Sequence, residues 1–334
     1  MTSTTIELPL VDLDDPHGSE ALHRGLHETG FFLLADHVIP RPLLDAVREE
    51  TSAFFSGPAA IKGQYTGPLR GWSALGAESA AAGYGADGER SGFDRCEKFS
   101  MGLPVSDETR AANPGYFGAP EATIYFSENR FPNDPMTEVW LQYYAKMQSL
   151  CARLVDEIRV SLGLEPGVWD EYLSQPPSLL RFLSYPDHAG GLRMGAHYDD
   201  TIVTVLHQSV PKSGFAALQV QLPGEEEWRS VVPSDDVFVV NVGEALTFLS
   251  GGRVVATKHR VIGPPTGAEG TARTSLAHFY LPNWNSRLCP SMPRAADGMS
   301  TSLDAPEFQE PDGSVLFYKV QQRQVDSLMG KPTE

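Results

Sequence analysis

The second half of the chain is a succession of short β-type runs, and this succession limits the possible folds more than any other feature. From Ser178 onward the runs are rich in Val, Ile, Leu and Thr, and turn-forming residues separate them. About eight strands at this spacing predict a sandwich or jelly-roll barrel. The runs are Leu179–Tyr185, Ile202–Gln208, Ala217–Leu222, Arg229–Val232, Val237–Val242, Val254–Thr257, Arg260–Ile262 and Thr274–Leu281.

The first half of the chain carries helical periodicity instead, with apolar residues that recur on one stripe. The longest helix is predicted to begin with Asp134 as its N-cap and Pro135 at its first position. A stretch rich in Gly, Ala and Ser, residues 56–133, is predicted to be irregular. The expected elements are an edge strand over 6–13, helices over 19–29, 40–55 and 134–162, a strand over 31–38, and a terminal helix that continues Val315–Val320.

Together these patterns predict one domain that is mainly β with N-terminal helices, a double-stranded β-helix (jelly-roll) barrel. The 334 residues allow about two domains by length, but β-rich folds of this size often form one. Residues 1–175 are expected to form a helical part packed on the barrel. Residues 176–285 are expected to form the jelly-roll core, and residues 286–334 a C-terminal segment that can act as a lid.

The net charge of the chain argues against some classes of binding partner. The formal net charge is -17, from 26 basic and 43 acidic residues. Nucleic acids and anionic membranes both require a basic surface, so neither is an expected partner. No apolar run approaches the length of a membrane span. A small molecule remains as the expected partner, and a local arginine cluster would still permit that molecule to be an anion.

The cysteines and the N-terminal residues indicate the cellular compartment in which the protein is expected. Cys96, Cys151 and Cys289 are odd in number and lack metal-type spacing, which favours a reducing cytoplasm over a disulfide framework. The first residues lack a basic stretch followed by an apolar core, so no signal peptide is expected. We therefore expect a cytoplasmic protein.

A candidate metal site lies in the β-type runs. His197 and Asp199 alternate along Gly195–Asp200, so on an extended strand both would face one side of the sheet. His259 lies in a second such run, Ala256–Ile262. If the two strands lie opposite each other, two imidazoles and one carboxylate meet on one face of a metal. This set leaves coordination positions open and suits non-haem Fe(II) oxygen chemistry.

A candidate carboxylate anchor follows the last of these ligands. Arg273 and Ser275 alternate at the start of another β-type run and offer a fork of donors and a hydroxyl. Zinc would also accept two histidines and an aspartate, and catalytic zinc sites keep an open position. A zinc hydrolase has no need of a separate Arg-x-Ser, whereas an oxygenase that uses a 2-oxo acid needs a cationic anchor for the far carboxylate. The ordered set therefore favours Fe(II).

This ordered set of motifs resembles the Fe(II)/2-oxoglutarate-dependent dioxygenases of the isopenicillin N synthase-like superfamily, over nearly the whole chain. The resemblance implies a metal site of His197, Asp199 and His259. It also implies that Arg273 and Ser275 bind 2-oxoglutarate and that Met194 lines the cosubstrate pocket. The motifs that carry the resemblance are Leu8–Leu13, Gly30–His37, His197–Asp199, Thr204–Gln208, Leu218–Val220, Val240–Leu246, His259–Val261 and Arg273–Ser275.

Within the superfamily the chain looks most like the bacterial penicillin ring-expansion enzymes, the deacetoxycephalosporin C synthases. The shared stretches are Leu179–Phe182, Leu192–Asp199 and Arg70–Trp72. Those enzymes have further arginines where this chain has Leu69 and Leu183, so the resemblance implies the reaction class and not a penicillin substrate. The candidate substrate contacts are Arg181, Arg70, Trp72 and Phe279, with Arg95, Lys98, Lys258, Phe99 and Trp284 as further candidates.

The resemblance implies an enzyme of bacterial secondary metabolism, such as antibiotic biosynthesis. It would use Fe(II), 2-oxoglutarate and O2 to oxidise an unactivated C–H of a small molecule, with release of succinate and CO2. Hydroxylation, desaturation, ring expansion and epoxidation are all compatible with the ligand set. Residues 67–102 and 283–315 are hypothesised to form lids over the site.

Two other interpretations stay open. One is an oxidase of the same superfamily that uses no 2-oxo acid, because such oxidases also carry the Arg-x-Ser motif. The other is a catalytically inactive protein that binds a small molecule in the pocket, although the intact set of His197, Asp199 and His259 argues against it.

Overall fold

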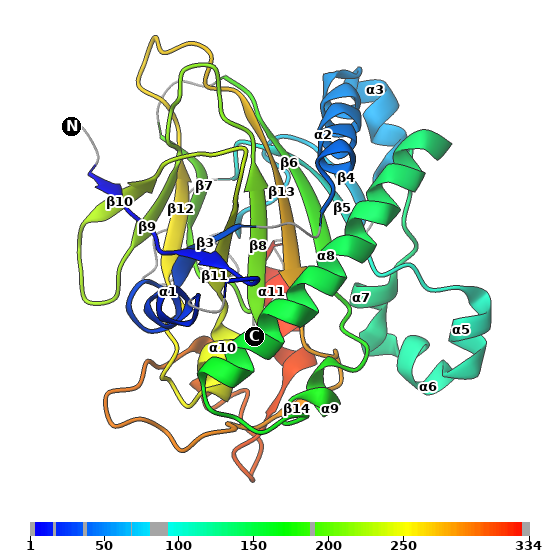
Figure 1. The fold of residues 1–334 in the computed structure, drawn as a ribbon. Helices are drawn as coiled ribbons and strands as arrows, with labels where there is room; N and C mark the ends of the chain where they lie inside the picture. The colour runs from blue at the N-terminus through cyan, green and yellow to red at the C-terminus, as the bar shows by residue number, and fades with distance from the viewer. Residues whose placement is uncertain are drawn as a thin grey trace.

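The larger of two facing sheets forms the framework of the protein (Figure 1). The computed structural model describes residues 4–15, 18–35, 39–67, 69–80, 93–187 and 191–328. The eight strands of this sheet lie in the order β2 (Leu10–Asp12), β3 (Phe31–Ala35), β11 (Phe238–Val242), β8 (Val203–Gln208), β13 (Arg273–Tyr280), β6 (Leu179–Tyr185), β5 (Glu97–Gly102) and β4 (Gly71–Ser73).

The smaller sheet faces it and completes the predicted jelly roll, although the two sheets do not join into a closed barrel. Residues of both sheets line one shared cavity, which lies between them. The order of the five strands is β1 (Thr5–Ile6), β10 (Trp228–Val231), β9 (Leu218–Gln221), β12 (Lys258–Ile262) and β7 (Leu192–His197).

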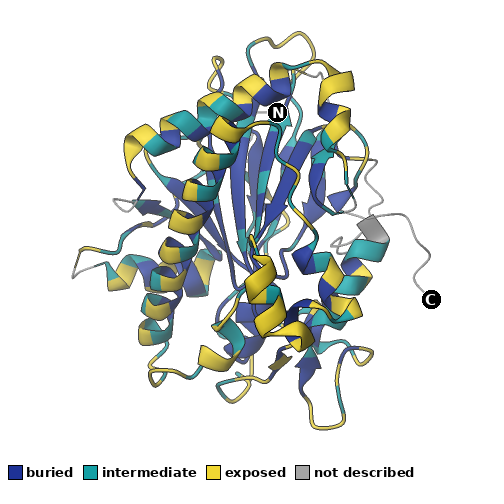
Figure 2. Ribbon diagram, turned by 90° about the vertical axis from the view of Figure 1, so that its right-hand side faces the viewer, coloured by how far each residue is buried: buried dark blue, intermediate teal, exposed yellow. Residues whose placement is uncertain are grey.

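Two long helices cover the outer face of the large sheet. α8 (Asp134–Ser161) and α2 (Arg41–Ser56) each have one buried face, made mostly of apolar residues, and one exposed face (Figure 2). Trp140 of α8 stacks on Phe182 of β6 with the ring centroids 4.0 Å apart. The N-cap of α8 is Asn133, whose side chain accepts the Met136 N–H, and not Asp134 as predicted. Asn133 is the N-cap because its side-chain oxygen reaches a backbone N–H at the helix start that has no partner within the helix.

Shorter elements surround this framework. The first predicted helix is present and ends in a π-helical turn at Gly30, whose φ of 62° is the left-handed conformation that glycine favours. The remaining elements are α1 (Ser19–Arg24), α3 (Ala59–Lys62), α5 (Asp107–Ala112), α6 (Pro114–Phe117), α7 (Thr123–Phe126), α9 (Asp170–Leu173), α10 (Glu244–Leu249), the pair β14 (Arg287–Leu288) and β15 (Val315–Leu316), and α11 (Phe317–Leu328).

Further expectations from the sequence are wrong in detail. The single edge strand expected over 6–13 is divided between β1 of the smaller sheet and β2 of the larger one. The run Val254–Thr257 is not a strand, although it is rich in β-branched residues. It is a buried loop held by the first helices, because Val255 N–H donates to the Leu26 carbonyl. The stretch 56–133 is not wholly irregular, because it contains β4, β5 and several short helices. Strand β5 was missed because buried polar residues interrupt its apolar pattern. Among the described residues, no helix is long and apolar enough to cross a membrane.

Candidate active site

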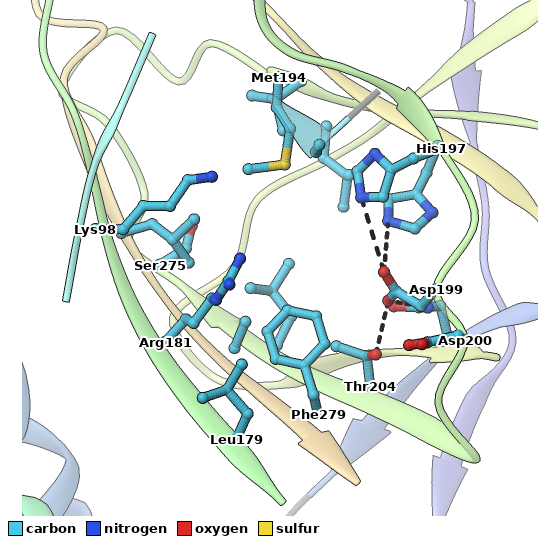
Figure 3. Close-up of a pocket in the computed structure, with 18 of the residues that line it drawn as sticks. Lys98, Leu179, Arg181, Met194, His197, Asp199, Asp200, Thr204, Ser275 and Phe279 are labelled. Carbon is cyan, nitrogen blue, oxygen red and sulfur yellow. Dashed lines mark hydrogen bonds and ion pairs between the residues drawn. The ribbon is translucent and has the colours of Figure 1, made fainter. Parts of the chain in front are cut away.

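The cavity between the two sheets brings together the histidines and the aspartate that the sequence singled out (Figure 3). β7 and β12 are antiparallel neighbours, and His197 and His259 are direct partners in their register. The imidazole centroids lie 4.3 Å apart. Asp199 lies beyond the end of β7, so the alternation of an extended strand is not what brings it to His197. The irregular segment that follows the strand, residues 198–200, positions it instead.

The three side chains form one compact set of ligand atoms. Oδ1 of Asp199 lies 3.7 Å from Nε2 of His197 and 3.9 Å from Nε2 of His259. All three ligand atoms lie within 4.8 Å of one another, and the three residues are buried. Two nitrogens and one oxygen on one side of a point fit a divalent transition metal and leave its other coordination positions open.

Backbone carbonyls set the orientation of both imidazoles. Nδ1 of His197 lies 2.8 Å from the Gly195 carbonyl oxygen, and Nδ1 of His259 lies 3.1 Å from that of Thr257. A carbonyl oxygen can only accept, so Nδ1 carries the proton in each ring and the lone pair of Nε2 is available to a metal.

The carboxylate of Asp199 is held by two neighbours. Thr204 Oγ1 donates to Oδ2 at 2.6 Å, and Asn241 Nδ2 donates to the same oxygen at 2.8 Å. Oδ1 is thereby the oxygen turned toward the histidines. Burial opposes ionisation of Asp199, but His259, His197 and these hydrogen bonds together lower its pKa. Burial, followed by the charge of His197, lowers the pKa of His259 to about 4. At neutral pH Asp199 is therefore an anion and His259 a neutral imidazole, which are the forms that bind metals.

The predicted carboxylate anchor lines the same cavity. Arg273 and Ser275 lie on β13 and are buried. Arg273 Nη1 donates to Gln208 Oε1, and its guanidinium lies 4.7 Å from the ring of Tyr185. Within the described structure, Arg273 Nε and Ser275 Oγ have no hydrogen-bond partner. Buried donors without partners are rare in proteins, so these atoms mark a place where a bound acceptor belongs. Met194 of β7 also lines the cavity.

Comparison with known proteins agrees with this geometry. Residues 175–282 match the family described as the 2OG-Fe(II) oxygenase superfamily, and residues 6–118 match the family described as non-haem dioxygenase in morphine synthesis N-terminal. The chain belongs to the 2OG-Fe(II) oxygenase superfamily. It is an Fe(II)- and 2-oxoglutarate-dependent dioxygenase, which uses O2 as the further cosubstrate.

Relatives are similar to the oxygenase in sequence, and solved structures are similar to it in fold. It is 28% identical to clavatol oxidase from Penicillium crustosum over 93% of this chain and 96% of the relative. It is 32% identical to deacetoxycephalosporin C synthase from Amycolatopsis lactamdurans, over 54% of this chain and 59% of that enzyme. Its fold is similar to that of a full-length Neurospora crassa protein in complex with alpha-KG and 5-formyluracil, with a TM-score of 0.71, 20% identity, and 99% and 100% of the two chains covered. A putative 2OG-Fe(II) oxygenase family protein from Caulobacter crescentus has a TM-score of 0.72 at 22% identity, over 97% and 99% of the two chains.

The four predicted substrate contacts of the oxygenase fall into two groups. Arg181 and Phe279 line the metal cavity, with the guanidinium carbon 5.9 Å from the centre of the phenyl ring. Arg70 and Trp72 line a neighbouring cavity, which shares Arg181 with the first. Arg70 Nη2 donates to the Tyr125 carbonyl at 2.6 Å. Arg70 and Trp72 therefore do not line the cavity that contains His197, Asp199 and His259.

The further candidates also divide. Lys98 of β5 lines the metal cavity, whereas Phe99 and Trp284 belong to the hydrophobic core. Arg95 and Lys258 do not line the metal cavity among the described residues. Of the predicted lids, residues 67–102 contribute Ala80 and Lys98 to the cavity lining, although residues 81–92 lie outside the described residues. Residues 283–315 contribute no lining side chain. Gln321 of α11 lines the cavity in their place.

Several residues of the site were missed by sequence reasoning. Thr204 and Asn241 hold Asp199, and Asp200 bonds to Gln321 Nε2 at the cavity wall. Asn241 had a usable signal, because it is the one polar residue in the apolar strand β11. Gln321 had none, because its helix meets the cavity only through the tertiary fold.

Proposed function

We propose that the protein oxidises an unactivated C–H of a small molecule, by hydroxylation, desaturation, ring expansion or epoxidation, with release of succinate and CO2. His197, Asp199 and His259 bind Fe(II), and Arg273 and Ser275 bind the distal carboxylate of 2-oxoglutarate. The observation that carries the proposal is that the ligand set and the unpartnered donors of the anchor share one buried cavity.

The side chains contribute binding, orientation and the exclusion of water. The bound iron supplies the oxidising chemistry, which no side chain of the cavity can supply. Asp199 is held by Thr204 and Asn241, so that one oxygen is directed to the metal position. Burial lowers the pKa of Arg273, yet a guanidinium remains a cation at neutral pH and matches a carboxylate with two parallel hydrogen bonds.

A role in secondary metabolism is part of the proposal. Support comes from the similarity to clavatol oxidase and to deacetoxycephalosporin C synthase, both of which carry a small molecule in their names. The net charge of -17 favours a small molecule over nucleic acid. The chain then acts as a single domain, in which the described part of the C-terminal segment, residues 286–328, forms part of the cavity through Gln321.

The first experiment is anaerobic addition of Fe(II) and 2-oxoglutarate to the protein. The expected result is a visible metal-to-ligand charge-transfer band, followed by succinate formation when O2 is admitted. Arg273→Ala should weaken the band at a given 2-oxoglutarate concentration, because the far carboxylate loses its cationic partner. Arg41→Ala, on the exposed face of α2, is the matched control and should leave the band unchanged.

Two outcomes contradict the proposal. If Fe(II) binds and no band forms with 2-oxoglutarate, the protein is an oxidase that uses no 2-oxo acid, and Arg273 and Ser275 anchor the substrate. If the band forms and no succinate appears with any substrate, the protein binds its small molecule without oxidising it.

A further inference from the structure

The wall of the cavity opposite the metal ligands carries two cations. Lys98 of β5 and Arg181 of β6 point into the cavity from the side away from His197 and Asp199 (Figure 3). The register of the two strands explains this arrangement, because Ser100 pairs with Arg181 and Lys98 with Leu183, so that all four residues face the same side.

Two carboxylates lie beside these cations, the buried Asp94 and the partly exposed Glu78, and neither of them lines the metal cavity itself. Lys98 Nζ lies 2.8 Å from Asp94 Oδ2 and 3.1 Å from Glu78 Oε2. Arg181 Nη1 lies 3.5 Å from the same oxygen of Glu78. The side chains of Lys98 and Asp94 are only 2% and 1% exposed. We refer to these four residues as the charged wall.

The charged wall holds two positive and two negative charges. Burial opposes ionisation of Glu78, but Arg181 and Lys98 lower its pKa to about 2. Burial likewise opposes the charge of Lys98, but Glu78, Cys96 and Asp94 raise its pKa. Among the residues that the structure describes, the charged wall is therefore electrically balanced.

A balanced wall discriminates among substrates by charge. A substrate carboxylate placed against it would bury a third negative charge, or would have to displace Glu78 from both cations. Either change leaves a buried charge without a full partner, which is strongly unfavourable. A neutral oxygen adds no charge. The ammonium of Lys98 has three N–H groups, of which two are accepted by Glu78 and Asp94, so within the described structure one remains to donate to such an oxygen.

Arg70 is a further buried cation near Arg181, but it forms no ion pair with the described carboxylates of the charged wall. Its guanidinium donates to the carbonyls of Leu69 and Tyr125, and it lines the neighbouring cavity together with Glu78. Asp200 also lines the metal cavity, but it lies beside Asp199, where Gln321 Nε2 donates to it, on the side away from Lys98 and Arg181 (Figure 3).

The rest of the cavity surface near this wall is apolar. Leu179, Leu183, Phe279 and Leu281 supply hydrocarbon and aromatic contacts. We propose, on the basis of the function proposed above, that the substrate is a neutral and mainly apolar small molecule whose carbonyl or hydroxyl oxygen accepts a hydrogen bond from Lys98. Glu78 is then the residue that makes the enzyme discriminate against carboxylates.

The test uses phenylacetamide and phenylacetate, two probes of nearly the same shape that differ in charge. Their dissociation constants are measured by calorimetry at about pH 7.5 on enzyme loaded with 2-oxoglutarate and with Zn(II) in place of iron. We expect the wild type to bind the amide at least about tenfold more tightly than the acid. Glu78→Gln gives the wall a net positive charge, and should shift this ratio at least about tenfold toward phenylacetate.

The matched control is Glu97→Gln. Glu97 lies on the same strand as Lys98 but pairs with Lys62 and Trp72 outside the metal cavity, so its loss should leave the ratio unchanged. Asp94→Asn provides a second route to a positive wall if Glu78→Gln does not fold, and should shift the ratio in the same direction. Lys98→Met should lose binding of the amide without a gain in binding of the acid.

The proposal is overturned if the wild type prefers phenylacetate, or if neither Glu78→Gln nor Asp94→Asn gains binding of phenylacetate. These outcomes are distinct from failure of the proposed function. The charge-transfer band with Fe(II) and 2-oxoglutarate requires neither probe, so a normal band with the wrong preference would reject only the neutral substrate.

Discussion

Two regions of the cavity differ in whether their charged side chains are paired with opposite charges. At the anchor, Arg273 Nε and Ser275 Oγ are buried without a hydrogen-bond partner in the described structure, and no described carboxylate pairs with Arg273. At the charged wall, Lys98 and Arg181 are paired with Glu78 and Asp94. A region whose charge the protein leaves unpaired selects an ion from outside, whereas a region that is already balanced favours a neutral group. The same residue type, arginine, therefore serves opposite purposes in the two places.

The largest expected effect concerns the metal side. His259→Ala removes one of the three ligand atoms and should lower the affinity for Fe(II) by more than about a hundredfold, with loss of succinate formation. Equilibrium dialysis with Fe(II) under anaerobic conditions measures the affinity. His278→Ala, a buried histidine that bonds to Gln148 away from the metal ligands, should bind Fe(II) normally. Equal affinities of the two variants would show that His259 is not a ligand.

The charged wall should respond to acid. Folding lowers the pKa of Glu78 from 4.5 to about 2, so its ionisation stabilises the fold fully above pH 4.5 and progressively less as the pH falls toward 2. The stabilisation is of the order of 3 kcal/mol at neutral pH. The free energy of unfolding of the wild type, measured with urea, should therefore fall between about pH 5 and pH 3. That of Glu78→Gln should fall less over the same range. Parallel pH profiles of the two proteins would mean that Glu78 is not held ionised by the wall.

A smaller effect should follow from the neighbours of Asp199. Thr204→Val removes one of the two hydrogen bonds to Oδ2 and should weaken Fe(II) binding by roughly tenfold, because the carboxylate becomes free to rotate. Asn241→Ala should act in the same direction. Thr274→Val, whose hydroxyl bonds to Ser209 away from the metal ligands, is the control and should not change the affinity. The d–d spectrum of Co(II)-loaded protein should change in Thr204→Val and stay constant in Thr274→Val.

The smallest expected effect concerns the neighbouring cavity. Trp72→Phe removes the indole N–H that donates to Glu97 at 2.8 Å, and should cost about 1 kcal/mol of stability. Binding of Fe(II) and 2-oxoglutarate should change by less than about twofold, because Trp72 does not line the metal cavity. The charge-transfer band measures the affinity for 2-oxoglutarate. A large loss of that affinity would show that the two cavities act as one functional region.

The sequence predicted the elements whose pattern is local. The periodicity of α8, the strands β6 and β13, and the turn at Gly30 are all visible in short windows of sequence. Val254–Thr257 was misjudged for the same reason, because its β-branched residues serve a buried loop that the first helices hold in place.

The site was predictable only as far as it follows from strand pairing. His197 and His259 are partners across two strands. The β-type runs around them predicted the strands, and the predicted metal site depended on these strands lying opposite each other. Glu78 and Asp94 gave no signal, because they come from a segment without periodicity and are recognisable only once β5 places Lys98 between them. Long-range contacts of this kind leave no trace in residue spacing.

The cavity draws its lining from positions as distant as Phe31 on β3 and Gln321 on α11. All three proposed metal ligands and the proposed anchor lie within residues 175–282, yet that stretch contains neither Lys98 nor either of these two residues. An excised core would therefore keep the atoms proposed to hold a metal, together with Arg181 and Phe279, and lose the part of the cavity lining that Phe31, Lys98 and Gln321 supply. Modular exchange of this segment between relatives would transfer the reaction with only part of its selectivity.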